Sequence, residues 1–246
     1  MALCEGYSVV GTSGINGDAY YISPDKSTFL LADGASGAGS EGKVLMSKLC
    51  VEVVKNNPFS LSELSPKEYL VKLIWEINNK LIAISQQQGH YIFGTIIICV
   101  VKENVGTIVA IGDSPAFYIH NNSITRVAKT KKTYHNLVEM GLYTEQELEQ
   151  AVYKLPEHMW SMFDRFIPMV VPTYVIEEIK LEKKDIIVFC SDGVSDYVQL
   201  DYIKDIVREE NLLESINTVI NTAKENSIRE RNCIKYDDLT MIAYVC

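Results

Sequence analysis

The stretch IIVFCSDGVSD, residues 186–196, is a continuous apolar run that breaks at Asp192, which a glycine follows. Two further segments have the same form: FLLADGASG at 29–37, which breaks at Asp33, and TIVAIGDSPAF at 107–117, which breaks at Asp113. An aspartate at the end of a strand projects beyond the hydrogen-bonded ladder, and a neighbouring glycine permits a tight turn. Asp-Gly is also a common turn pair, so one such segment alone indicates only a turn. Three in one chain indicate that several carboxylates gather at one edge of a sheet.

More aspartates stand in similar places. Asp18 lies in INGDAYY, and Asp237 and Asp238 precede the last apolar run, LTMIAYV at 239–245. Crowded carboxylates repel one another and resist ionisation unless cations neutralise them. The sequence contains no cluster of histidines or cysteines at metal-ligand spacing, and an all-oxygen site favours hard ions. The pattern therefore predicts a site for Mg2+ or Mn2+.

The composition is that of an ordinary globular protein, with 246 residues, 47% of them hydrophobic, and a formal net charge of −9. The chain has no repeat and no obvious linker, so we expect a single domain over residues 1–246. The acidic charge argues against nucleic acid or a membrane surface as the main partner, because both attract basic proteins. No apolar run approaches the roughly 20 residues of a membrane span, and no targeting signal opens the chain. We therefore expect a cytoplasmic protein whose six cysteines, none in a C-x-x-C pair, are ordinary reduced thiols.

Apolar runs bounded by turn residues predict strands at 7–10, 19–23, 28–32, 93–101, 107–112, 116–120, 123–128, 174–179, 185–190 and 239–245. A helix is expected over 43–55, where apolar residues recur every four positions. A second helix begins with the capping box Ser65–Glu68 and continues through Ile84. Further helices are expected over about 199–228. Residues about 129–168 are less regular and predict a helical excursion or flap over the sheet.

The order of these elements predicts the fold class. Strands follow one another as hairpins instead of alternating strictly with helices, which indicates largely antiparallel sheets. Pairs of helices would then cover the outer faces of the sheets. We therefore expect an α+β layered sandwich whose strand ends meet at one rim.

Six segments, in order over nearly the whole chain, resemble the motifs of the protein phosphatase 2C family, the metal-dependent serine/threonine phosphatases. They are NGDA at 16–19, LLADGASGAGSEGKVLMSKL at 30–49, FGTIIICVV at 93–101, AIGDSPAFYIH at 110–120, IIVFCSDGVSDYV at 186–198 and YDDLTMIAYV at 236–245. Each segment is short, but six in the family's order and spacing make the chain similar to a divergent, bacterial-like member.

The resemblance implies the family's αββα sandwich, with two mainly antiparallel sheets flanked by helix pairs, in agreement with the pattern above. It also implies hydrolysis of phosphomonoesters by a water that two Mn2+ or Mg2+ ions activate. The partner would be a protein phosphorylated on serine or threonine, such as a kinase or its substrate. The implied site residues are Asp33 as the bridge between two metals, the carbonyl of Gly34 on the second metal, Asp192 and Asp237 on the first, Asp18 through a metal-bound water, and Asp113 at a third, weaker metal site.

Several positions depart from the family pattern. The family commonly places an arginine that grips the substrate phosphate five residues before the aspartate of N-x-D, and here that position is Ser13. No arginine precedes Arg126, so the contact is missing or supplied from elsewhere, and Arg165 in the excursion is one candidate. If the position is vacant, Ser13→Arg is expected to raise kcat/KM by about 10- to 100-fold. Pro115 and Asp238 also stand where family motifs have arginine and asparagine.

Two functions fit this mixture of retained and altered positions. The first is an active, divergent phosphatase, and the second is a pseudo-phosphatase that uses the fold as a regulatory or binding module. The retained carboxylates favour the first, since a scaffold has little reason to keep acids that repel one another without metal. A phosphatase of the haloacid dehalogenase type would need D-x-D after an early strand, and LLADGASG lacks the second aspartate.

Overall fold

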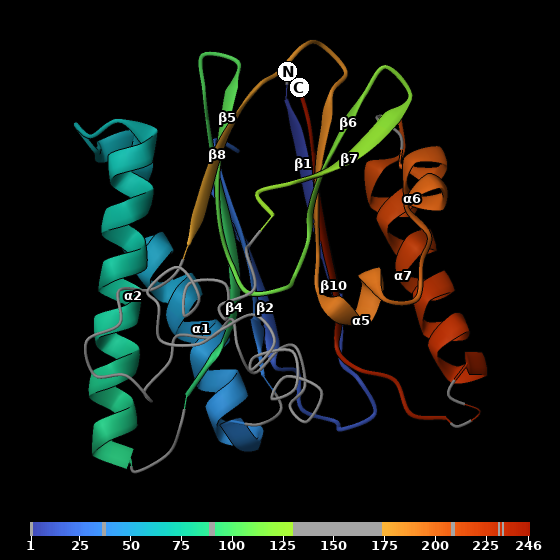
Figure 1. The fold of residues 1–246 in the computed structure, drawn as a ribbon, viewed down its shortest axis with the longest axis horizontal. Coiled ribbons are helices and arrows are strands. Elements are labelled where there is room, and N and C mark those ends of the chain that lie inside the picture. Colours follow the sequence, from blue (N-terminus) through green and yellow to red (C-terminus); the bar gives the residue numbers. More distant parts are fainter. Residues whose placement is uncertain are drawn as a thin grey trace, which may run out of the picture.

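Two five-stranded sheets lie face to face at the centre of the molecule (Figure 1). In this computed structural model the described residues are 2–35, 38–88, 92–129, 174–207, 210–230, 232 and 234–246. The excursion expected at about 129–168, together with its candidate Arg165, lies outside the described residues except for Lys129.

The strands of each sheet pair antiparallel throughout. The first sheet has the order β2-β3-β4-β5-β8, with strands Asp18–Ile22, Thr28–Gly34, Gly94–Lys102, Val105–Ile111 and Val175–Lys180. The second has the order β1-β10-β9-β6-β7, with strands Leu3–Val9, Leu239–Val245, Ile186–Cys190, Ala116–His120 and Ser123–Val127.

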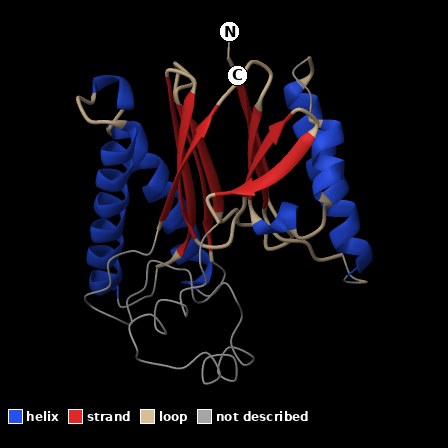
Figure 2. Ribbon diagram, turned by 45° about the horizontal axis from the view of Figure 1, so that its top comes forward, coloured by secondary structure: helices blue, strands red, loops and turns tan. Residues whose placement is uncertain are grey.

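Helices cover the outer face of each sheet (Figure 2). On the first sheet these are α1, Gly39–Asn56, and α2, Pro66–Gln88, joined through the short 3-10 helix η2, Phe59–Leu61. On the second sheet they are α5, Asp192–Ser195, α6, Leu200–Ile206, and α7, Leu212–Glu230. The predicted α+β sandwich of two antiparallel sheets flanked by helices is confirmed.

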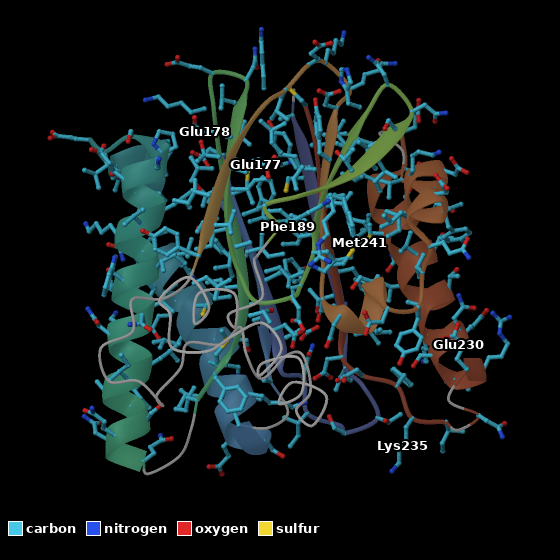
Figure 3. The ribbon with its side chains drawn as sticks, in the orientation of Figure 1. Glu177, Glu178, Phe189, Glu230, Lys235 and Met241 are labelled. Atoms are coloured by element: carbon cyan, nitrogen blue, oxygen red, sulfur yellow. The ribbon has the colours of Figure 1, made fainter. Side chains whose placement is uncertain are left out.

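Apolar side chains form three layers between these elements. In the central layer, Phe29 and Phe189 come from facing sheets and their ring centroids are 5.1 Å apart. Figure 3 labels Phe189 of this central layer. It also labels Met241, which belongs to the outer layer between the second sheet and α7. Strand β4 is buried on both faces from Gly94 to Val100, because helices cover one face and the second sheet covers the other. Its sequence is therefore a continuous apolar run and not an alternating one.

The predicted capping box at the start of α2 is present. The carboxylate of Glu68 accepts hydrogen bonds from the backbone N–H of Ser65 at 3.0 Å and from its hydroxyl at 2.6 Å. Pro66 is the first helical residue, where its missing N–H costs nothing because that group has no partner inside the helix. Contacts among neighbouring residues therefore determine where this helix begins.

The first strand differs from the prediction in length and in partner. It runs over Leu3–Val9 instead of 7–10, and it pairs with β10, the last strand of the chain, with Leu3 opposite Val245. The two chain termini therefore lie side by side at one end of the sandwich (Figure 1). A short strand does not reveal a partner more than 200 residues away, because its pattern shows only which face is buried.

No helix in the described part of the chain is both long enough and apolar enough to span a membrane.

Candidate metal centre

The strand ends that carry the predicted aspartates lie at the end of the sandwich opposite the chain termini (Figure 1). Strands β3 and β5 end there and strand β2 begins there in the first sheet, while β9 ends and β10 begins there in the second. Antiparallel pairing brings the end of one strand beside the start of the next. We call this edge the acidic rim, defined by Asp18, Asp33, Asp113, Asp192 and Asp237.

Asp18 and Asp33 stand directly opposite each other in the β2–β3 ladder, so their side chains share one face of the sheet. Asp18 is buried, with 7% of its surface exposed, and within the described residues its Oδ2 atom has no hydrogen-bond partner. Burial raises the pKa of Asp18 to about 7, although the nearby side chains of Thr240, Asp33 and Ser191 partly oppose the shift. A buried carboxylate oxygen without a close donor is one that a cation or a bound water would stabilise.

The charges of three other rim carboxylates act on Asp33. Its pKa is raised well above the usual value, first by burial and then by the negative charges of Asp18, Asp192 and Asp237. These acids come from four separate segments of the chain, and their mutual effect shows that the fold brings them together.

Asp192 is the first residue of the short helix α5, directly after β9. Its pKa is raised to about 6, first by burial and then by the charges of Asp237 and Asp113. The glycine after it is also required, because a Cβ atom at Gly193 would overlap the carbonyl oxygen of Asp238. The Asp-Gly pair therefore lets α5 pack closely against the start of β10.

Asp113 follows Gly112, whose φ of 97° lies in the left-handed region that favours glycine. The backbone carbonyl of Asp113 accepts a hydrogen bond of 2.9 Å from the guanidinium of Arg126 on β7. The sequence pattern predicts Asp113 at the rim. It does not predict the contact with Arg126, because that contact depends on the pairing of β6 with β7.

Gly34, the predicted carbonyl ligand, is the last residue of β3, and its N–H donates to the carbonyl of Gly17 at 3.1 Å. A Cβ atom at Gly34 would overlap the backbone carbonyl of Lys43 in α1. Only glycine at this position lets the first turns of α1 pack against the end of the strand.

The neighbouring acids Asp237 and Asp238 have different surroundings. Asp238 is buried, and its carboxylate accepts hydrogen bonds from the N–H of Gly11 at 2.7 Å, the N–H of Gly17 at 2.8 Å and the ammonium of Lys43 at 2.8 Å. Asp237 is partly exposed, its charge raises the pKa of both Asp33 and Asp192, and one of its oxygens accepts the N–H of Asp238 at 2.9 Å. Asp238 therefore binds the loop before β2, whereas Asp237 remains at the rim with the other acids.

Lys43 is the functional candidate that the sequence reasoning missed. Its ammonium lies 3.4 Å from the hydroxyl of Ser13, so a cation does stand beside the position where the family has its arginine. A signal was available, because Lys43 falls on the same face of α1 as the buried residues Met46 and Cys50. A lysine on a buried helix face needs a charged partner, and that partner is Asp238.

The residues of the rim fit divalent cations in their chemistry. All the predicted side-chain donors are carboxylates, several have raised pKa values, and Asp18 has a buried oxygen without a donor. As the side chains stand, the described residues contain no group of three carboxylate, imidazole or thiol side chains arranged around one metal position. The rim is therefore a set of neighbouring acids and not a closed ligand shell.

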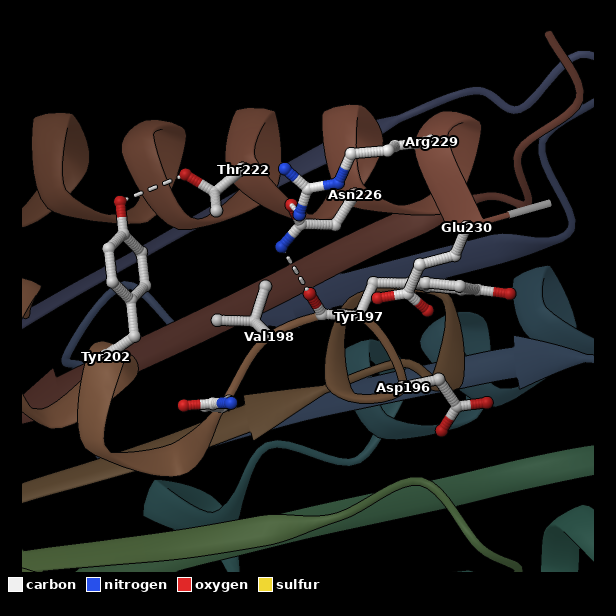
Figure 4. Close-up of a pocket in the computed structure, with 9 residues that line it drawn as sticks. Asp196, Tyr197, Val198, Tyr202, Thr222, Asn226, Arg229 and Glu230 are labelled. Carbon is white, nitrogen blue, oxygen red and sulfur yellow. Dashed lines mark hydrogen bonds between the residues drawn. The ribbon is translucent and has the colours of Figure 1, made fainter. Parts of the chain in front are cut away.

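A separate pocket of about 340 Å³ lies between the α5–α6 segment and α7 (Figure 4). Its polar groups bind one another: the hydroxyls of Tyr202 and Thr222 are 3.0 Å apart, and Asn226 donates to the carbonyl of Tyr197 at 2.8 Å. The guanidinium of Arg229 donates to Asn226 at 2.7 Å. Because the residues lining this pocket do not include the predicted ligands, we place the candidate centre at the acidic rim.

Comparisons with known proteins agree with the fold described above. No protein-family model matches the chain. The serine/threonine phosphatase stp of Listeria welshimeri is 21% identical over 220 residues, which cover 86% of this chain and 83% of that protein. The crystal structure of the serine/threonine phosphatase PstP/Ppp of Mycobacterium tuberculosis has a TM-score of 0.75 at 19% identity and covers 99% of this chain and 98% of that one. The catalytic domain of PstP in complex with two manganese ions has a TM-score of 0.75 at 20% identity, with coverage of 99% and 97%.

The chain thus shares its fold with these serine/threonine phosphatases over nearly its whole length, and its sequence is similar to that of stp over 86% of the chain.

Proposed function

We propose that this protein is a metal-dependent protein serine/threonine phosphatase that hydrolyses phosphomonoesters. The observation that carries the proposal is the group of poorly neutralised carboxylates at the rim of a phosphatase 2C sandwich. Carboxylates crowded in this way destabilise a fold unless cations neutralise them, so bound cations explain the group better than a structural role does. The relatives named above are serine/threonine phosphatases, and one of them holds two manganese ions.

The residues that would hold Mn2+ or Mg2+ are Asp33, Asp192 and Asp237 together with the carbonyl of Gly34, and Asp113 would hold a further, more weakly bound ion. Bound ions would lower the pKa of a water and offset the charge of the phosphoryl oxygens. Asp18 would then orient water in the site through Oδ2, the buried atom that no described donor contacts.

No cysteine in the described part of the chain is suited to act as the nucleophile. Cys190 lies within two residues of Asp192, but it is fully buried in the apolar layer against α7. Burial raises the pKa of the Cys190 thiol far above neutrality, so the reactive thiolate is scarcely populated. Direct hydrolysis without a covalent phosphoenzyme agrees with this arrangement.

The test is hydrolysis of p-nitrophenyl phosphate and of a phosphothreonine peptide with Mn2+, with Mg2+ and with excess EDTA. We expect turnover that requires an added metal ion and that Asp33→Asn abolishes. Unchanged turnover in EDTA would exclude this mechanism. Binding of Mn2+ in calorimetry without hydrolysis of either substrate would support the pseudo-phosphatase instead.

A further inference from the structure

Lys43 is a buried cation whose position brings it to the acidic rim. Only 7% of its side chain is exposed, and its ammonium donates to Asp238 at 2.8 Å and to the Ser13 hydroxyl at 3.4 Å. The stem of the side chain passes beside Gly17, where an added Cβ atom would lie 2.6 Å from Cδ of Lys43 and 3.1 Å from the carbonyl oxygen of Gly34. The lysine therefore runs alongside a proposed metal ligand.

The ammonium of Lys43 keeps hydrogen-bonding capacity beyond its ion pair with Asp238. The carboxylate of Asp238 is shared between the ammonium and the backbone N–H groups of Gly11 and Gly17. An ammonium has three N–H donors, and among the described residues two of those of Lys43 have partners. One donor is left for an anionic ligand.

Stability alone is a weak reason for this ion pair. Removing two charges from water is expensive, and apolar residues of similar volume often serve a core equally well. Ser13, whose hydroxyl lies 3.4 Å from the ammonium, is small and exposed. An anion entering the rim past Ser13 would meet Lys43.

We propose that Lys43 binds the phosphate of the substrate and that Asp238 is the positioning residue that holds its ammonium in place. This inference rests on the proposed phosphatase function, and it names the group that holds the anion. The rim would otherwise repel a phosphate dianion, since its acids carry negative charge wherever metal ions do not offset it. Arg126, a second cation near the rim, donates instead to the backbone carbonyl of Asp113 at the end of another strand.

The first experiment measures phosphate binding directly. Inorganic phosphate is titrated into Mn2+-loaded wild type, Lys43→Met and Lys48→Met in calorimetry, and KM and kcat for p-nitrophenyl phosphate are measured in parallel. Lys48 lies on the same helix but is exposed, so Lys48→Met controls for the loss of a lysine from α1. We expect Lys43→Met to weaken phosphate binding by about 10- to 100-fold and to raise KM more than it lowers kcat.

A rescue separates phosphate binding from a structural role. In Lys43→Met/Ser13→Arg, the guanidinium is introduced beside the lost ammonium, and phosphate affinity should recover to within about tenfold of the wild type. Loss of packing would not recover in this way. If Lys43→Met does not fold, Lys43→Met/Asp238→Asn removes both buried charges and provides the second background for the same rescue.

The outcomes distinguish this inference from the proposed function. Unchanged phosphate affinity and KM in folded Lys43→Met, or weakened affinity that Ser13→Arg does not recover in either background, would overturn the role of Lys43 while leaving an active phosphatase. A wild type that binds phosphate through Lys43 but hydrolyses neither substrate would overturn the phosphatase function and leave the phosphate site.

Discussion

Two buried aspartates at opposite ends of the sandwich have contrasting surroundings. Asp185, next to the chain termini, is 4% exposed and is bound by His120 at 2.8 Å, by the Tyr118 hydroxyl at 2.5 Å and by the N–H of Glu182 at 2.7 Å. Asp18, at the acidic rim, is 7% exposed and has an oxygen without a donor in the described part of the chain. Both carboxylate oxygens of Asp185 therefore have hydrogen-bond partners, whereas one oxygen of Asp18 has none among the described residues.

The difference between the surroundings of Asp185 and Asp18 indicates that the two ends of the molecule have different roles. Where an aspartate serves the fold, the chain surrounds it with donors, as it does for Asp185. Where donors are withheld and other carboxylates crowd in, as around Asp33, the negative charge is available to something that the chain itself does not supply. The difference therefore separates structural acids from functional ones within one protein.

The largest expected effect follows from replacing an aspartate at the acidic rim. Asp33→Asn or Asp192→Asn keeps the shape of the side chain and removes a negative charge from the rim. We expect at least ~100-fold loss of phosphatase activity together with loss of Mn2+ binding, measured by phosphopeptide hydrolysis and by calorimetry.

Asp185→Asn is the matched control at the opposite end. It should leave kcat/KM within about threefold of the wild type, because it lies far from the rim. It should instead lower the melting temperature, since a charge-assisted bond contributes roughly 1.5 to 3 kcal/mol. Equal activity losses at both ends would remove the distinction between structural and functional acids.

How much of this could be predicted depends on the range of the interactions. The strands and the rim followed from local features, namely apolar runs that end at Asp33 and Asp192. The ion pair of Lys43 with Asp238 joins residues 195 positions apart, and its existence depends on how α1 packs against the start of β10. Periodicity identifies a buried lysine, but it does not identify the lysine's partner.

A smaller effect concerns stability and pH in the protein without metal ions. The pKa of Asp18 is raised to about 7 and that of Asp192 to about 6, whereas the unfolded chain ionises near pH 4. The folded state therefore keeps protons that the unfolded state has lost, so the contribution of these groups to stability is present below pH 4 and is lost as the pH rises to about 7. We expect the melting temperature with Mn2+ minus that with EDTA to increase over this range.

Asp18→Asn sharpens the same comparison. The substitution removes a carboxylate whose ionisation is disfavoured by burial. In EDTA at pH 7.5 we therefore expect a melting temperature higher by about 2 to 4 °C. This shift corresponds to roughly 1 kcal/mol for a domain of this size. The difference between variant and wild type should vanish near pH 4, where both side chains are neutral. A melting temperature that falls at pH 7.5 would show that Asp18 is a structural acid, like Asp185.

The smallest expected effect comes from the layer just behind the rim. Cys190 precedes Asp192 by two residues, yet it is fully buried among apolar side chains and its thiol pKa is raised by burial. Cys190→Ala removes one sulfur atom from that layer, and we expect it to lower the free energy of unfolding by about 1 kcal/mol. The phosphatase activity and Mn2+ affinity should stay within about twofold of the wild type, because the carboxylates of the rim are untouched. A folded Cys190→Ala protein that binds Mn2+ but has lost its activity would show that the reaction uses the thiol, and the contrast between the two aspartates would then no longer locate the chemistry.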